Sequence, residues 1–240
     1  MGKYVIDEMT LTAIGDSIRS KEETAEAVPV TQMAARISAL KDPQLKAVVE
    51  GNIKEISDDT ITRVAAHAFR ENYVLKTVHL PEATFIGGQG FLDCTALQEV
   101  YLPKVTSAGS QAFEGCTALT ALSLPNVTTG ATYLVRDCSK LETVELPKMT
   151  SVQTQTFSGC TSLKTVSVPV AKSIASAAFK NCTSLEWVDF SGCTEVATLS
   201  NTNAFSTVPT TCEIRVPAAL LEEWKAAANW STYASQIVGV

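Results

Sequence analysis

Five cysteines recur every 22 residues, and such a row is the part of this chain best suited to metal binding, disulfide formation or nucleophilic chemistry. They are Cys94, Cys116, Cys138, Cys160 and Cys182. A zinc site needs four ligands that converge on one point, whereas thiols at one phase of a repeat lie in a line. Neighbouring thiols that point the same way also have poor disulfide geometry. We therefore expect reduced, buried, structural thiols and no metal.

The other two cysteines, Cys193 and Cys212, fall outside this row. A disulfide between them is left open as the alternative to two free thiols. Disulfides form mainly in exported proteins, and the N-terminal residues do not have the pattern of a signal peptide. Free thiols are therefore the expectation here too.

The remaining candidates for catalysis are sparse. The sequence has two histidines, His67 and His79, and a Cys–His pair would need contact between a thiol and an imidazole. His79 is expected on an outward strand position, while the cysteines point inward. The glycine-rich run 87–90 is not followed by Lys-Ser or Lys-Thr, so it predicts a chain turn and no phosphate loop. We expect no catalytic residue, no cofactor and no enzyme activity.

Leucines and prolines keep the same 22-residue period, which places the cysteines in a repeated structural unit. The leucines are Leu75, Leu97, Leu119, Leu141, Leu163 and Leu185, and the prolines are Pro81, Pro103, Pro125, Pro147 and Pro169. Alternating apolar residues before each proline predict one short strand per unit, which the proline then ends. A repeat of this length predicts a solenoid whose successive strands pair in parallel through right-handed connections.

The repeat has two irregularities. A phenylalanine is expected inside most coils, with neighbouring rings stacked along the axis, but Leu134 and Val135 replace the usual Ala-Phe pair. Near the C-terminus the phase slips by four residues, and the extra residues are expected between Ala197 and Phe205. We expect a local packing change at the first irregularity and a surface loop at the second.

Both ends of the chain differ from the repeat. Helical spacing predicts a helical segment over residues 1–51, which either caps the solenoid or attaches it to an assembly and could join copies of the chain into an oligomer. The repeats occupy residues 52–217. Residues 218–240 predict a helical cap, because a bare terminal coil would expose its core. Four residues of this cap are expected to lie on the last coil: Trp224, Trp230, Tyr233 and Ile237.

Charge and hydropathy exclude two classes of partner. The formal net charge is −6, with 19 basic and 25 acidic residues, and no basic cluster indicates nucleic-acid binding. No run of 18 apolar residues indicates membrane insertion. Without a signal-peptide pattern, the expected location is the cytoplasm, a phage particle or the outside after non-classical export, with the cell surface as the alternative.

The repeat unit resembles that of the BspA-like branch of the leucine-rich repeat proteins. The segments AFEGCTALTALSLP (112–125) and TFSGCTSLKTVSVP (156–169) carry this resemblance, which covers roughly residues 53–217. It implies an α/β leucine-rich-repeat solenoid and a non-catalytic role in binding protein, with no fixed binding residues. The residues TLTAIGDSIRSK and VTQMAARISAL resemble a lead-in segment of prophage and tail-associated proteins.

The outward positions of the strands are the remaining place for a functional site. Among them, His79, Tyr101 and Trp187 are the candidate binding residues, because exposed aromatic side chains favour interfaces. The predicted function is therefore a structural or protein-binding repeat protein, in one version a prophage- or tail-associated component. The alternative is a bacterial surface adhesin that binds a host protein or glycan.

Overall fold

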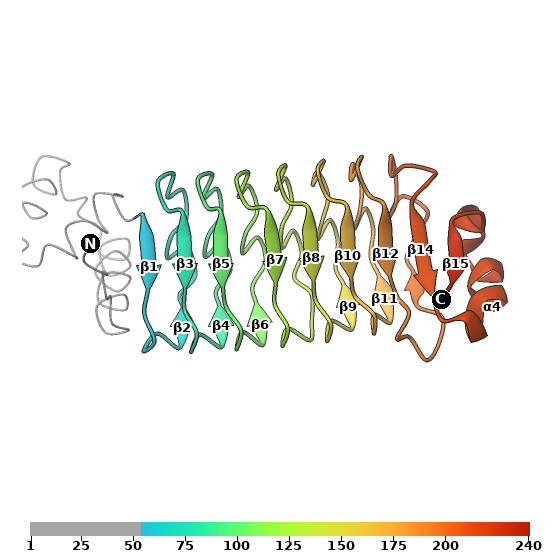
Figure 1. Cartoon of the computed structure of the whole chain (residues 1–240), viewed down its shortest axis with the longest axis horizontal. Helices are drawn as coiled ribbons and strands as arrows, with labels where there is room; N and C mark the ends of the chain where they lie inside the picture. The colour runs from blue at the N-terminus through green and yellow to red at the C-terminus, as the bar shows by residue number, and fades with distance from the viewer. Residues whose placement is uncertain (1–53) are drawn as a thin grey trace, which may run out of the picture.

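A computed structural model describes residues 54–240, which form an elongated solenoid of about eight coils of about 22 residues (Figure 1). The predicted helices of residues 1–51 lie outside the described residues. Each coil contributes one short strand to the main strand face, and the neighbouring strands that pair do so in parallel. These strands are β1 (Glu55–Ser57), β3 (Thr77–His79), β5 (Glu99–Tyr101), β7 (Ala121–Ser123), β8 (Thr143–Glu145), β10 (Thr165–Ser167), β12 (Trp187–Asp189) and β14 (Glu213–Val216).

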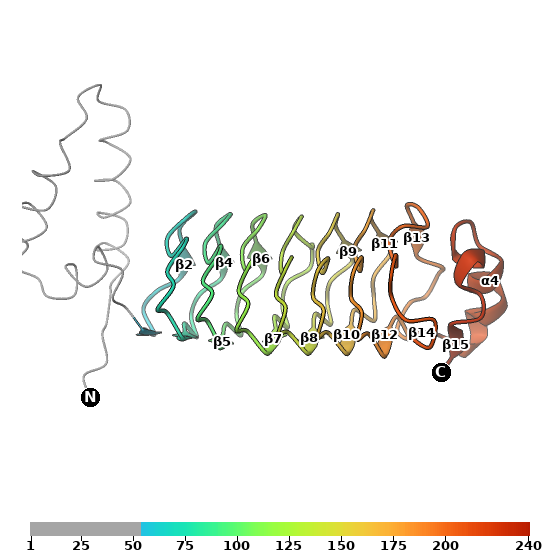
Figure 2. The ribbon, with the colours of Figure 1, turned by 90° about the horizontal axis from the view of Figure 1, so that it is seen from above.

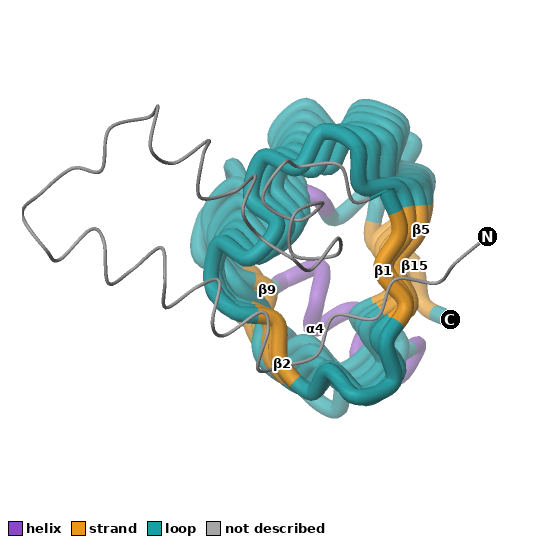
Figure 3. The backbone as a smooth tube through the Cα atoms, turned by 90° about the vertical axis from the view of Figure 1, so that its left-hand side faces the viewer, coloured by secondary structure: helices purple, strands orange, loops and turns teal. Residues whose placement is uncertain are grey.

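The prediction of one strand per coil is wrong, because most coils carry a second strand of two residues. These strands are β2 (Arg63–Val64), β4 (Phe85–Ile86), β6 (Ser107–Ala108), β9 (Ser151–Val152), β11 (Ser173–Ile174) and β13 (Thr198–Leu199). The view along the axis shows them on a different side of the coil from the main strand face (Figure 3). Two residues are too few to show an alternating pattern, so the sequence did not reveal this second ladder.

The repeated apolar residues fill the interior, as their period predicted. The periodic leucines and cysteines are at most 1% exposed, and the rings of Phe91 and Phe113 stack with centres 5.3 Å apart. The expected packing change at Leu134 and Val135 is confirmed: both are fully buried, and the ring column stops at Phe113 and resumes at Phe157. Leu134 is thus larger than the alanine usual at its position, and Val135 is smaller than the phenylalanine usual at its position.

The coils before the last one turn two tight corners with left-handed backbone, four residues apart. Gln89 and Asp93 have φ of 59° and 56°, and Gly115 has φ of 71°. In the run 87–90 the left-handed residue is therefore Gln89 and not a glycine. Gly87 is needed for a different reason, since a Cβ there would lie 2.3 Å from the amide nitrogen of Ala66 in the preceding coil.

The extra residues near the C-terminus are placed earlier than predicted. Ile174 pairs with Leu199, a step of 25 residues, whereas Val152 and Ile174 are 22 apart. Three of the four additional residues therefore precede Thr198, and the expected position between Ala197 and Phe205 is wrong. The prediction placed the extra residues too late because Val196, 22 residues after Ile174, is apolar like Val152 and Ile174 and so resembles their successor, which in the structure is Leu199.

The C-terminal residues close the solenoid, as predicted, but also add a strand. They form two 3₁₀ turns, η1 (Ala218–Leu220) and η2 (Trp230–Tyr233), the helix α4 (Leu221–Ala226) and the strand β15 (Ile237–Gly239), which pairs with β14. Trp224 and Trp230 are fully buried against the last coils. Within residues 54–240, α4 is the only α-helix, which is less helix than an α/β class implies.

Candidate functional site

The outward residues of the main strand face form two aromatic clusters. In the three-residue strands the middle side chain points into the core, so the first and third point outward. His79 ends β3 and Tyr101 ends β5, and these two residues are register partners. Their rings stack with centres 4.6 Å apart and an interplanar angle of 18°. The structure thus brings two of the three predicted residues together, and Tyr101 is 51% exposed.

Trp187 forms the second cluster, with partners that the sequence reasoning missed. It begins β12 and is half-buried, and the guanidinium carbon of Arg215 on β14 lies 4.6 Å from its ring centre. The Nε and Nη2 atoms of Arg215 lie 2.9 and 2.8 Å from the Oε2 atom of Glu213. This carboxylate holds the guanidinium over the indole, so the cation–π contact has a fixed geometry.

A shallow depression of about 350 Å³ adjoins this second cluster. Its lining comprises Ser184, Leu185, Glu186, Trp187, Pro209, Thr211, Glu213 and Arg215. Thr211 follows Leu185 by the 26-residue step of the last coil and takes the position that a buried leucine fills in the preceding coils. It is exposed and leaves this volume unfilled. One aromatic ring, two carboxylates, a guanidinium and hydroxyl groups can together hold a polar ligand.

The two clusters lie on the same face but are not one site. Strands β7, β8 and β10 lie between β5 and β12 along the main strand face (Figure 1). The outward residues of the intervening strands are small or polar, and Thr143, Ser123 and Glu145 are among them. A ligand that touches both clusters must therefore be extended.

The cysteine row is structural. The Cys116 thiol donates to the carbonyl oxygen of Phe91 at 3.2 Å, and Cys138 donates to Phe113 at 3.0 Å. Burial raises the pKa of Cys94 and of Cys182 to about 12, so these thiols stay protonated at neutral pH. Protonated thiols are poor nucleophiles and poor metal ligands. Cys193 and Cys212 are free and buried as well, with no disulfide between them.

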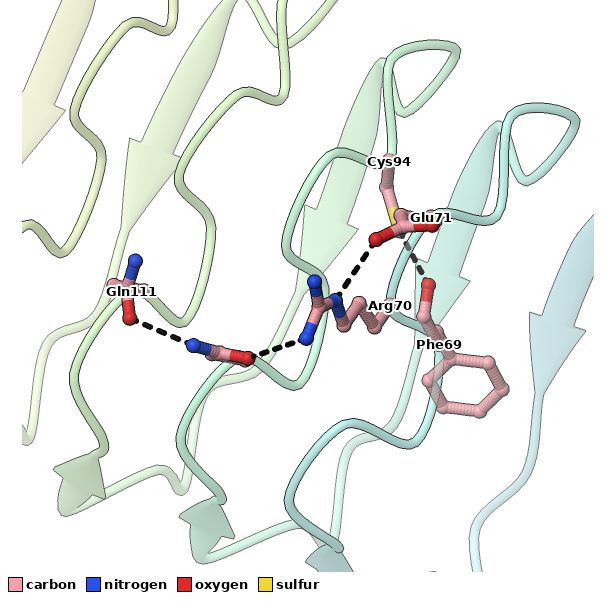
Figure 4. Close-up of polar contacts among 6 residues, drawn as sticks. Phe69, Arg70, Glu71, Cys94 and Gln111 are labelled. Atoms are coloured by element: carbon pink, nitrogen blue, oxygen red, sulfur yellow. Dashed lines mark hydrogen bonds and ion pairs between the residues drawn. The ribbon is translucent and has the colours of Figure 1, made fainter.

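A row of polar side chains runs along another side of the solenoid, at the left-handed corners. Arg70 Nη1 donates to Gln89 Oε1 at 3.2 Å, and Gln89 Nε2 donates to Gln111 Oε1 at 2.8 Å. Figure 4 shows these contacts, together with the ion pair of Arg70 and Glu71. Gln111 then donates to Glu114. The polar groups in this row bind one another, either within a coil or between neighbouring coils, which indicates a structural role.

The described residues hold no arrangement suited to a bound metal. In the range 54–240, no group of three or more His, Cys, Asp or Glu side chains is placed to share one ion. The same residues contain no helix with the length and apolar character to cross a bilayer.

Comparison with known proteins places this repeat in a family. The family model of the BspA type leucine rich repeat region, which appears in six copies, matches residues 50–164 and 131–227. These matches cover well over half of the chain. The chain belongs to the BspA-type leucine-rich repeat family. Proteins of this family and fold are typically non-catalytic, and a role as a binding or structural repeat protein is consistent with it. No curated protein matches the sequence.

A solved structure shares the fold of this BspA-type repeat protein. The leucine-rich repeat protein of T. pallidum has a TM-score of 0.59 and 22% identity, and the match covers 65% of this chain and 78% of that one. A leucine-rich cell surface protein of Faecalibacterium prausnitzii A2-165 has a TM-score of 0.47 and 20% identity over 77% of this chain. This chain spans 58% of that protein. At 22% identity the likeness to the T. pallidum protein concerns the fold alone.

Proposed function

We propose that this chain is a non-catalytic binding protein whose main strand face binds an extended protein or glycan ligand. The observation that supports this most is the placement of two aromatic clusters, His79–Tyr101 and Trp187–Arg215, on one face of a rod. Exposed aromatic and arginine side chains supply most of the binding energy at many interfaces. A ligand spanning both clusters gains affinity because two contacts on one molecule act together.

In this proposal the ligand binds non-covalently and is not chemically changed. The outward side chains of the strand face include carboxylates, hydroxyls and one arginine, and the thiols are buried on the inside. Binding therefore rests on stacking, hydrogen bonds and charge.

The setting is a prophage- or tail-associated assembly, in which residues 1–51 attach the rod and the strand face contacts a partner. This setting is proposed from the resemblance of these residues to lead-in segments of tail proteins, whereas the family match begins only at residue 50. Neighbouring tail genes would favour this setting, whereas genes for surface export would favour an adhesin instead.

A defined panel tests the proposed function. The wild-type chain and the Tyr101→Ala/Trp187→Ala variant are applied to a glycan array and to immobilised purified host matrix proteins. Tyr73→Ala serves as the matched control, because Tyr73 is an exposed aromatic residue outside the main strands. We expect binding that the double variant loses at least tenfold and the control keeps. Binding that the double variant retains would place the ligand elsewhere on the molecule.

A further inference from the structure

The two ladders of backbone hydrogen bonds break at the same place. Strands β5 and β7 follow each other along the main strand face, but within residues 54–240 no pairing joins them, and the sheet divides into β1-β3-β5 and a part that begins at β7. The Leu80 amide donates to Tyr101 and the Leu124 amide donates to Glu145, each at 3.1 Å. In the described structure the equivalent amide of Leu102 donates to no backbone carbonyl. We call this interface, between coils 99–120 and 121–142, the seam.

The second ladder stops at the seam as well. It consists of β2-β4-β6 on one side and β9-β11-β13 on the other, and the isolated bridge of Thr129 belongs with Ser151 on the far side. A third set of backbone bonds continues across the seam, at the left-handed corners. Gln111 donates to Thr132 at 3.0 Å, and Phe113 donates to Leu134 at 2.9 Å. The backbone bonds between these coils therefore continue along one side and are interrupted along the other two. Just beyond β5 and β7 a side-chain bond also crosses the seam, from the Asn126 amide to the Pro103 carbonyl oxygen at 2.8 Å.

Exposure and spacing give independent support for a parted seam. Val100 is the middle residue of β5 and points inward, yet it is only half-buried, whereas Val78 and Leu122 on the neighbouring strands are 2% and 1% exposed. Figures 1 and 2 both show a wider space between β5 and β7 than between β3 and β5 or between β7 and β8. The inward side chain next to the interrupted pairing is thus less well covered than its neighbours.

A change of repeat type accounts for the position of the seam. A Cβ at Gly109 would lie 2.4 Å from the amide nitrogen of Gly88, so the coils before the seam come close through glycines at this corner. The next residue at the same position is Ala131, which carries a Cβ and cannot approach as closely. The same coil holds Leu134 and Val135 in place of Ala-Phe. Two kinds of coil therefore meet at the seam.

We propose that the seam is a hinge that joins two rigid units, residues 54–120 and 121–240. The continuous bonds from Gln111 to Thr132 and from Phe113 to Leu134 act as its axis, and the strand side opens and closes. Closure pairs Glu99 with Ala121, as their place in the repeat requires. The hinge lies between the His79–Tyr101 and Trp187–Arg215 clusters, so its motion changes the distance and angle between them. This motion breaks few hydrogen bonds, because the backbone ladders on the strand side are already interrupted at the seam.

Hydrogen exchange resolved by NMR tests the parted seam on the full chain. The amides of Leu102 and Thr120 should exchange at least tenfold faster than those of Leu124 and Glu142. The latter pair occupies the same positions one coil later, and each amide donates to a backbone carbonyl. Equal protection of the two pairs would show that the seam is closed and would overturn the proposal.

A disulfide staple tests the motion. In the Glu99→Cys/Ala121→Cys variant the two new thiols can meet only when the seam closes, whereas Thr143→Cys/Thr165→Cys joins register partners of a regular pair. Unlike the buried cysteine row, these outward side chains can change rotamer, and paired strands lie about 4.8 Å apart, which a disulfide can bridge. We expect the seam variant to cross-link at least tenfold more slowly than the control but to completion, and the staple to slow exchange at Leu102 and Thr120. A seam pair that stays reduced while the control oxidises would mean a rigid, open interface and no hinge.

Discussion

The guanidinium of Arg215 lies over the indole ring of Trp187, 4.6 Å from its centre, although 28 positions separate the two in the sequence. Their strands are paired neighbours, and Glu213 holds the arginine through Nε and Nη2. The last coil carries four extra residues and still returns to the main strand face in register, which brings Arg215 beside Trp187. A surface aromatic thereby gains a fixed charged partner beside a depression.

Replacing Trp187 with alanine should weaken binding without unfolding the chain. The indole is half-buried and its loss removes one cation–π contact, so the free energy of unfolding should fall by about 1 kcal/mol. Urea titration of Trp187→Ala measures this cost. A loss as large as that for Phe113→Ala, which should be about 3–5 kcal/mol for a fully buried ring, would show that Trp187 serves mainly the fold.

The two tryptophans of the C-terminal cap should respond differently to the same substitution. Trp230 Nε1 donates to the carbonyl oxygen of Ala197 at 2.6 Å, whereas Trp224 Nε1 is buried with no hydrogen-bond partner among the described residues. Trp230→Phe leaves a buried carbonyl without its donor and should cost about 1–3 kcal/mol. Trp224→Phe removes an unsatisfied donor and should cost clearly less. Denaturant midpoints compare them, and equal losses would contradict the assigned hydrogen bonds.

The irregular coil allows the ring column to be restored. Val135→Phe alone inserts a ring beside Leu134, which is fully buried, and should destabilise by about 1–3 kcal/mol through overpacking. The Leu134→Ala/Val135→Phe variant recreates the Ala-Phe pair found at Ala112 and Phe113 and should recover most of that loss. Thermal or urea unfolding of both variants measures the coupling. Additive effects would show that the two positions do not share one space.

Stability should fall in alkaline solution because of the thiols. Burial raises the pKa of Cys94 from its ordinary value near 9 to about 12 and raises that of Cys138 strongly, so the unfolded chain releases these protons first. Their contribution is fully present below pH 9 and is lost as the pH rises toward 12, by about 1.4 kcal/mol per pH unit for each thiol. Urea midpoints at pH 8 and 9.5 measure it.

A matched variant isolates the thiol effect from other alkaline titrations. Cys138→Ala removes the hydrogen bond to Phe113 at both pH values, so only its pH dependence is informative. The difference in free energy of unfolding between pH 8 and pH 9.5 should shrink by about 0.7 kcal/mol relative to the wild type. An unchanged difference would show that this thiol ionises equally in both states.

Much of the solenoid could be predicted because its core residues repeat. Leu119, Cys116 and Phe113 are buried at the phases that the 22-residue period assigns to them. The outward placement of Tyr101 also followed from strand alternation. The Arg215 contact could not be predicted, since the slip of the last coil hides which outward residues are neighbours. The seam depends on the spacing between backbones. Its sign in the sequence is weak: the repeat position that Gly109 holds in one coil is held by Ala131 in the next.

Hydroxyl-radical footprinting with a ligand from the binding panel is the most direct test of the main strand face as the binding surface. Aromatic side chains report their own exposure, and Tyr73, which is 59% exposed and lies outside the main strands, serves as the internal reference. We predict that the ligand reduces oxidation of Tyr101 and Trp187 and leaves Tyr73 unchanged. Protection of Tyr73, with Tyr101 and Trp187 oxidised as in the free protein, would contradict the proposed binding face.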